Sequence, residues 1–143
     1  MNPQSINILN ELYKNSGTSA ESVKTLMTDA SGNPIREKMQ GQVLGYKHFK
    51  DSAEKALLES GITPREQTSL SKTISELSTR LNVMPDKSPS HLSEIMIENS
   101  TSGIVCLKRT LNQNPQADPP VREQAESLIN LEHANIEEMK QFL

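Results

Sequence analysis

One acidic residue of this sequence falls within an apolar pattern near its C-terminal end. The apolar residues that repeat there at helical spacing are Val121, Ala125, Leu128, Ile129, Ile136, Met139 and Leu143. Glu132 lies on the line that they define, and Asn135 lies beside it on the same side. A carboxylate buried on such a face costs several kcal/mol unless it is paired, hydrogen-bonded or protonated. The pattern therefore predicts polar partners for Glu132.

Polar residues on two other apolar faces are candidates for these partners. Asn99 lies near the centre of one face, flanked by Ser100 and Thr110, and Gln42 lies beside Tyr46 on another. One interpretation is a satisfied polar layer that fixes helix register. A second is an internal site for a metal or a polar ligand, and a third is a face that a partner or second subunit covers. The candidate set for a polar layer or ligand site is Glu132, Asn135, Asn99, Gln42 and Tyr46.

The histidines of the sequence do not form a metal signature. A di-iron helical bundle uses two Glu-x-x-His pairs, because residues three apart project toward one metal. The residues three positions before the histidines are Gly45 before His48, Ser88 before His91 and Asn130 before His133. None of them is an acid, so we expect neither a metal nor a cofactor.

No recognised catalytic motif is present. Cys106 lies on an apolar face, where a thiol behaves as a small hydrophobic group, and no base is positioned to activate it. Gly103 stands among small residues, which favours close approach of a neighbouring helix over a phosphate-binding role. We therefore expect a protein without enzymatic activity.

Glycine, proline and capping residues divide the chain into five expected helices, at about 3–31, 34–60, 65–83, 90–113 and 119–142. Each has one apolar face. The first keeps its phase through Asn15–Ser19, so we expect one long helix that could kink there. The fourth has the widest apolar arc, which predicts that it is the central helix. Short connections favour neighbouring antiparallel helices, so the fold class expected is all-α, an antiparallel up-and-down bundle of four to five helices.

The composition narrows the choice of partners. The chain has 143 residues, is 34% hydrophobic and has a net charge of -3, which fits a single domain over 1–143. No basic field would attract nucleic acid, and no apolar run approaches the roughly 20 residues of a membrane span. The single cysteine, Cys106, and the absence of a recognisable signal sequence favour a cytoplasmic location.

Two segments carry a resemblance to a known family. Asp86–Ile97 (DKSPSHLSEIMI) and Leu131–Lys140 (LEHANIEEMK) resemble an uncharacterised bacterial family of small ferritin-like helical bundles. The resemblance implies an up-and-down bundle from a bacterium, and it brings no established activity. Since the di-iron ligands are missing, iron storage or oxidation does not follow from it.

The function expected is therefore a non-enzymatic one, exerted through protein contacts or self-association. Phe142 and Leu143 continue an apolar face to the end of the sequence, which favours a homodimer. The alternative is a ferritin-like bundle that binds a metal or a small ligand through the buried polar residues of its core.

Overall fold

The computed structural model describes residues 1–30, 33–65 and 70–143. The described residues form helices and no strand, which confirms the all-α class. The helices are α1 (Pro3–Met27), α2 (Asn33–Glu59), α3 (Leu70–Val83), α4 (Pro89–Gln113) and α5 (Pro119–Lys140).

Three of the helices begin with a proline that follows a residue able to cap. Asn2 caps α1, because its Oδ1 accepts a hydrogen bond from the backbone N–H of Ser5 at 2.8 Å. Ser88 caps α4 in the same way. Asp118 stands in the capping position of α5 but makes no side-chain cap bond there. Its carboxylate instead accepts a hydrogen bond from the Ser5 hydroxyl at 3.0 Å, which ties the start of α5 to α1.

Two expected boundaries need correction. The first helix ends at Met27 and not at 31, because the backbone N–H of Ala30 bonds to the Met27 carbonyl in a turn; residue 31 lies outside the described residues. The third helix is described from Leu70, so the expected start at 65 is not seen, and residues 66–69 lie outside the described part of the chain. Between α2 and this segment, Gly61 has a φ of 75°, a left-handed conformation typical of a residue that ends a helix.

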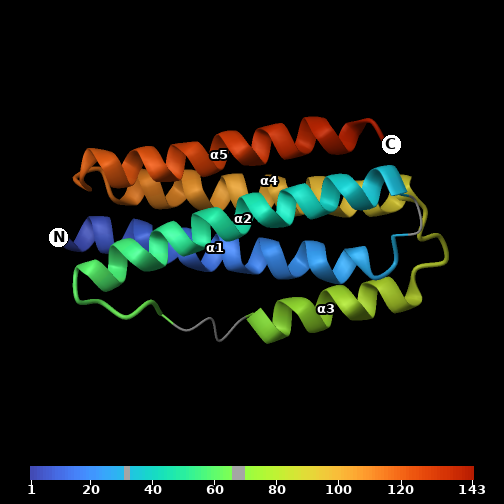
Figure 1. Cartoon of the computed structure of the whole chain (residues 1–143), viewed down its shortest axis with the longest axis horizontal. Coiled ribbons are helices and arrows are strands. Elements are labelled where there is room, and N and C mark those ends of the chain that lie inside the picture. The colour runs from blue at the N-terminus through green and yellow to red at the C-terminus, as the bar shows by residue number, and fades with distance from the viewer. Residues whose placement is uncertain (31–32, 66–69) are drawn as a thin grey trace.

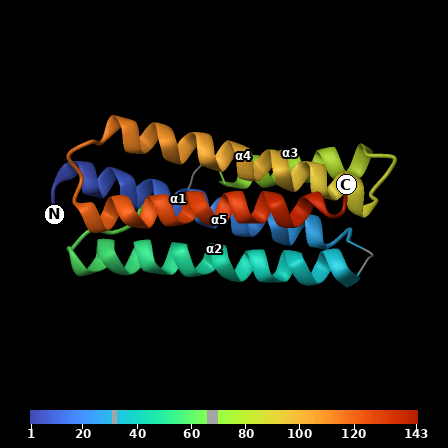
Figure 2. The ribbon, with the colours of Figure 1, turned by 90° about the horizontal axis from the view of Figure 1, so that it is seen from above.

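Four long helices lie alongside one another and the shorter α3 lies on the outside (Figures 1 and 2). The helix with neighbours on most sides is α1, which packs against α2, α3, α4 and α5. The expectation that the fourth helix is central is therefore wrong. The apolar arc of α4 packs against α5 and α1. Small buried residues of α1, such as Ser16, Gly17 and Ala20, let several neighbouring helices approach it closely.

The hydrophobic core lies between α1, α2, α4 and α5. Its largest fully buried side chains are Ile8, Leu9, Leu12 and Leu26 from α1, Ile35, Met39 and Leu57 from α2, Leu92, Ile95 and Leu107 from α4, and Leu128 and Met139 from α5. From α3 only Leu77 and Leu81 are buried among the described residues. No helix in the described part of the chain is both long and apolar enough to cross a membrane.

Candidate functional site

The carboxyl group of Glu132 is fully buried in the bundle, with 0% of the residue exposed. The Tyr46 hydroxyl on α2 donates a hydrogen bond to Glu132 Oε1, and the Ser100 hydroxyl on α4 lies 3.4 Å from the same oxygen as a second donor. Asn135, one turn further along α5, donates from Nδ2 to the Tyr46 oxygen at 3.0 Å. Three helices thus supply a polar cluster inside an apolar core.

The second carboxyl oxygen of Glu132 has no hydrogen-bond partner, and neither does Oδ1 of Asn15 on α1. Both atoms lie around Gly103 of α4. A Cβ added to Gly103 would overlap Glu132 Oε2 and would stand 3.3 Å from Asn15 Oδ1. Buried polar atoms without partners are uncommon in folded proteins. Both oxygens lie beside one glycine, and each of them still lacks a donor.

The surroundings of Glu132 shift its protonation toward the neutral acid. Burial raises the pKa of Glu132 to about 7, although the hydrogen bonds of Tyr46, Ser100 and Asn135 pull it the other way. The pKa of Tyr46 is also raised, first by burial and then by the adjacent Glu132 carboxylate. Tyr46 therefore stays a protonated donor, whereas Glu132 changes its charge near neutral pH.

The other residues of the candidate set are placed differently. Gln42 is buried and donates to Glu138 Oε1 at 3.1 Å, with the Asn135 carbonyl at 3.5 Å. It contacts the polar cluster through Asn135 and makes no hydrogen bond with Glu132.

Asn99 departs from the expectation. It is half-buried and none of the hydrogen bonds to Glu132 in the described residues comes from it. The next residue, Ser100, faces the carboxyl group, because one step along a helix turns the side chain by about 100°. Thr110 bonds back to the Cys106 carbonyl of its own helix at 2.9 Å.

Asn15 was not foreseen as part of the site. The sequence shows it as the start of a stretch of weak helix formers, but it also lies three positions after Leu12, which places it near the buried side of α1. Its Nδ2 donates to the Gly103 carbonyl at 3.4 Å. Gly103 was expected to admit a neighbouring backbone, and what it admits is the Glu132 carboxyl and the Asn15 amide.

A groove of about 320 Å³, lined mostly by polar residues but with more apolar than polar surface, lies at this part of the surface between α1, α3 and α4. Its size is at the lower end of the range for small-molecule sites. Asn15 and Gly103 form part of its wall, so Glu132 Oε2 lies directly behind the groove. The lining residues are Glu11, Lys14, Asn15, Thr18, Ser19, Ser22, Thr73, Asn99, Ser102, Gly103 and Cys106.

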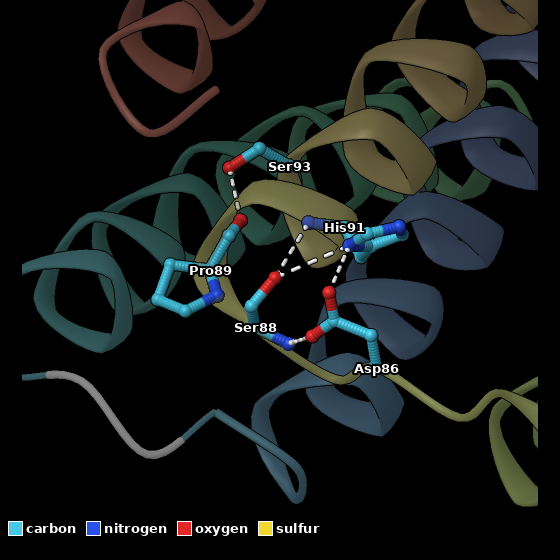
Figure 3. A network of polar contacts seen from close by, with 5 residues as sticks. All are labelled: Asp86, Ser88, Pro89, His91 and Ser93. Carbon is cyan, nitrogen blue, oxygen red and sulfur yellow. Dashed lines mark hydrogen bonds and ion pairs between the residues drawn. The ribbon is translucent and has the colours of Figure 1, made fainter.

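The histidines lie outside this cluster. His91 is part of a polar network at the start of α4 (Figure 3), where its Nδ1 lies 2.8 Å from Asp86 Oδ2. The Ser88 backbone N–H donates to Asp86 Oδ1 at 2.8 Å and lowers the pKa of Asp86. This network fixes the turn that leads into α4. His48 and His133 are exposed, and no group of three or more potential metal-ligating side chains occurs among the residues that the structure describes.

Comparison of the chain with protein-family models, with curated proteins and with solved structures finds no match.

Proposed function

We propose that this protein is a non-enzymatic helical-bundle protein that acts through protein contacts, with self-association as a homodimer. The observation that carries the proposal is the exposure of large apolar side chains at one end of the molecule. Val83, the last residue of α3, is 77% exposed, and Leu143, the last residue of the sequence, is 60% exposed. Figure 1 shows the end of α3 and the C-terminus at the same end. A second copy at this end would remove both side chains from water.

Sedimentation velocity over a range of concentrations tests the proposal. We expect a dimer that weakens about tenfold or more in Val83→Glu and in Leu143→Glu, since each change places a charge in the interface. The matched control is Leu58→Glu. Leu58 is 53% exposed but lies in the last turn of α2, at the other end of the molecule (Figure 1). A strict monomer at high concentration, or a dimer that only Leu58→Glu disrupts, would contradict the proposal.

The finer description of the fold belongs to the same proposal. We propose an antiparallel up-and-down bundle of ferritin-like architecture without the di-iron motif, in a cytoplasmic bacterial protein. It is supported by the course of the chain in Figure 1, in which successive helices run in opposite directions, and by the missing Glu-x-x-His spacing. The single cysteine fits a reducing compartment.

A second candidate function is the binding of a small polar ligand in the groove between α1, α3 and α4. The observation that favours it is the pair of unpartnered buried oxygens, Asn15 Oδ1 of a lining residue and Glu132 Oε2 behind Gly103. The same alternative includes metal binding, which metal analysis of the protein with and without a chelator tests. For a polar ligand, thermal shift against polyols, amines, amino acids and carboxylates is the direct test.

A blocking variant connects any thermal shift to the groove. Ser102 lies in the groove lining and is exposed, so Ser102→Leu fills the groove with little effect on the core. Ser127→Leu is the matched control, on an exposed position of α5. We expect a stabilising ligand to lose its effect in Ser102→Leu and to keep it in Ser127→Leu. No shift with any member of the panel, or equal shifts in both variants, would count against this function.

A further inference from the structure

Among the described residues, the buried side-chain oxygens that lack a partner are Asn15 Oδ1, of a residue that lines the groove between α1, α3 and α4, and Glu132 Oε2, which lies behind the lining residue Gly103. Both are acceptors when Glu132 is ionised. In that state both oxygens lie beside Gly103 and neither has a hydrogen-bond donor. Protonation of Glu132 on Oε2 turns this oxygen into a donor, and Asn15 Oδ1 beside the same glycine becomes its acceptor once a small side-chain rotation brings the two within hydrogen-bond distance.

The amide of Asn15 has a second orientation that serves the ionised carboxylate. A half-turn about its Cβ–Cγ bond exchanges Nδ2 and Oδ1, and this terminal torsion is a soft one. Nδ2 can then donate to Glu132 Oε2. The turn gives up two interactions of Nδ2: its bond to the Gly103 carbonyl, which is long at 3.4 Å and therefore weak, and its hydrogen bond to the Glu11 carboxylate. After the turn, Asn15 Oδ1 and the Gly103 carbonyl lie together, without the amide donor, in residues that line the groove.

We propose that the groove binds a small molecule through a primary ammonium group, whose N–H donors bond to Asn15 Oδ1 and the Gly103 carbonyl while Glu132 is ionised. This inference rests on the second candidate function and names its ligand class. The proton balance is simple. The O–H bond of Glu132 breaks, its proton goes to solvent, and the carboxylate gains the Asn15 N–H. Ligand binding and proton release are thus one linked event.

The charges around the site favour a cation. From α1, Glu11 and Lys14 line the groove; burial raises the pKa of Glu11, while Lys14 and a hydrogen bond from Asn15 lower it. From α2 the titratable group that reaches Glu132 is Tyr46, which stays neutral. Among the described residues, α3 brings Thr73 to the lining and α4 brings no acidic or basic side chain to it. From α5, Glu132 lies behind the lining residue Gly103. The two carboxyl groups, of Glu11 and Glu132, outnumber the one basic group, of Lys14, so the local charge favours a positively charged ligand.

The linkage gives the proposal a definite pH dependence. Because the ligand binds the ionised form, the measured Kd rises as Glu132 becomes protonated. With a pKa of about 7, the affinity should increase about tenfold between about pH 6 and about pH 8. An alkyl ammonium group, with a pKa close to that of lysine, keeps its charge over this range.

Titration calorimetry with 1,4-diaminobutane tests this inference, and 1,4-butanediol is the uncharged control. We expect the affinity for the diamine to increase about tenfold between about pH 6 and about pH 8. Because binding releases a proton, the measured heat of binding should differ between buffers of different protonation enthalpy. The diol should not bind. Asn15→Ala should weaken diamine binding at least tenfold, and Asn112→Ala, an exposed asparagine of α4 outside the groove lining, should not.

Glu132→Gln separates the linkage from general electrostatics. The amide cannot ionise, so diamine binding should lose its pH dependence in this variant. If the pH dependence of diamine binding is unchanged in Glu132→Gln, it arises from Glu11, and the proposal is overturned. Equal binding of diol and diamine, no diamine binding, or full affinity in Asn15→Ala would also overturn it. A polar ligand found in the thermal-shift panel would then still support the second candidate function, so the two failures are distinguishable.

Discussion

At the scale of single residues, the protein places a carboxyl group where water cannot reach it and gives it an uneven set of partners. Glu132 Oε1 receives donors from Tyr46 and Ser100, whereas Oε2 receives none. A hydrogen bond to a buried group contributes about 1 kcal/mol net, but a buried group left without one costs about 1–3 kcal/mol. The two oxygens therefore have opposite effects on stability, and substitutions at this position can separate them.

Glu132→Gln should be tolerated far better than Glu132→Ala. Glutamine keeps an acceptor for Tyr46 and Ser100, and its Nε2 supplies the donor that Asn15 Oδ1 lacks. Alanine leaves the Tyr46 and Ser100 hydroxyls without their acceptor and opens a cavity, so it should cost about 1–3 kcal/mol more than glutamine. Urea unfolding at neutral pH measures both variants. Equal unfolding midpoints would show that the hydrogen bonds of this carboxyl group contribute nothing to stability.

The stability of the wild type should fall as the pH rises toward and past neutrality, relative to Glu132→Gln. The pKa of Glu132 is raised from 4.5 to about 7 in the folded protein, so the folded state binds more protons than the unfolded state between these values. The free energy of unfolding then decreases across this window. The difference between the two proteins should change by about 3 kcal/mol at most between about pH 5 and about pH 8. Denaturant unfolding at these two pH values checks the prediction, and a constant difference would contradict it.

At the scale of helices, Gly103 shows that the sequence pattern of one helix does not determine which side chains of other helices lie beside a glycine. Glycine in a helix costs about 1 kcal/mol relative to alanine, so a helical glycine with free space is a site of easy stabilisation. Gly41 of α2 is such a site, since nothing lies within 4 Å of the position that its Cβ would take. At Gly103 the same atom would overlap Glu132 Oε2. Two glycines inside helices therefore have opposite environments.

Gly103→Ala should destabilise the protein by about 2 kcal/mol, because the Glu132 carboxyl must move away from its partners. Gly41→Ala should stabilise it by up to about 1 kcal/mol. Thermal unfolding of both variants measures the contrast, and helix propensity is controlled because both changes are the same. Two stabilising effects of similar size would show that the carboxyl group can relax without cost.

The helices themselves were largely predictable, and the contacts between them were not. Proline after a capping residue located the starts of α1, α4 and α5, because this combination acts within a few residues of the chain. The burial of Glu132 also follows from the period of its own helix. Its partnership with Ser100 rather than Asn99 depends on how α4 is rotated against α5, and the role of Asn15 depends on which helix covers Gly103. Both are properties of packing between helices that the period of a single helix does not fix.

At the scale of the whole molecule, α3 is the least firmly attached helix. It packs mainly against α1, and its buried contribution among the described residues is Leu77 and Leu81. An ion pair between Arg80 and Glu98, whose nitrogen and oxygen lie 2.9 Å apart, connects it to α4. Both side chains are about half exposed, so this pair adds little to stability.

Native-state hydrogen exchange should therefore show α3 opening at a lower free energy than the four long helices. Leu81→Ala removes a buried side chain from this helix, so it should speed exchange within α3 while the slowest amides of α4 and α5 keep their rates. Leu128→Ala, at a fully buried position of α5, should lower the global stability by about 2–5 kcal/mol and speed exchange everywhere. If Leu81→Ala instead speeds exchange in all helices equally, α3 unfolds only together with the bundle. Since Thr73 of α3 lines the groove between α1, α3 and α4, the separate opening of α3 would also remove part of that lining without unfolding the core.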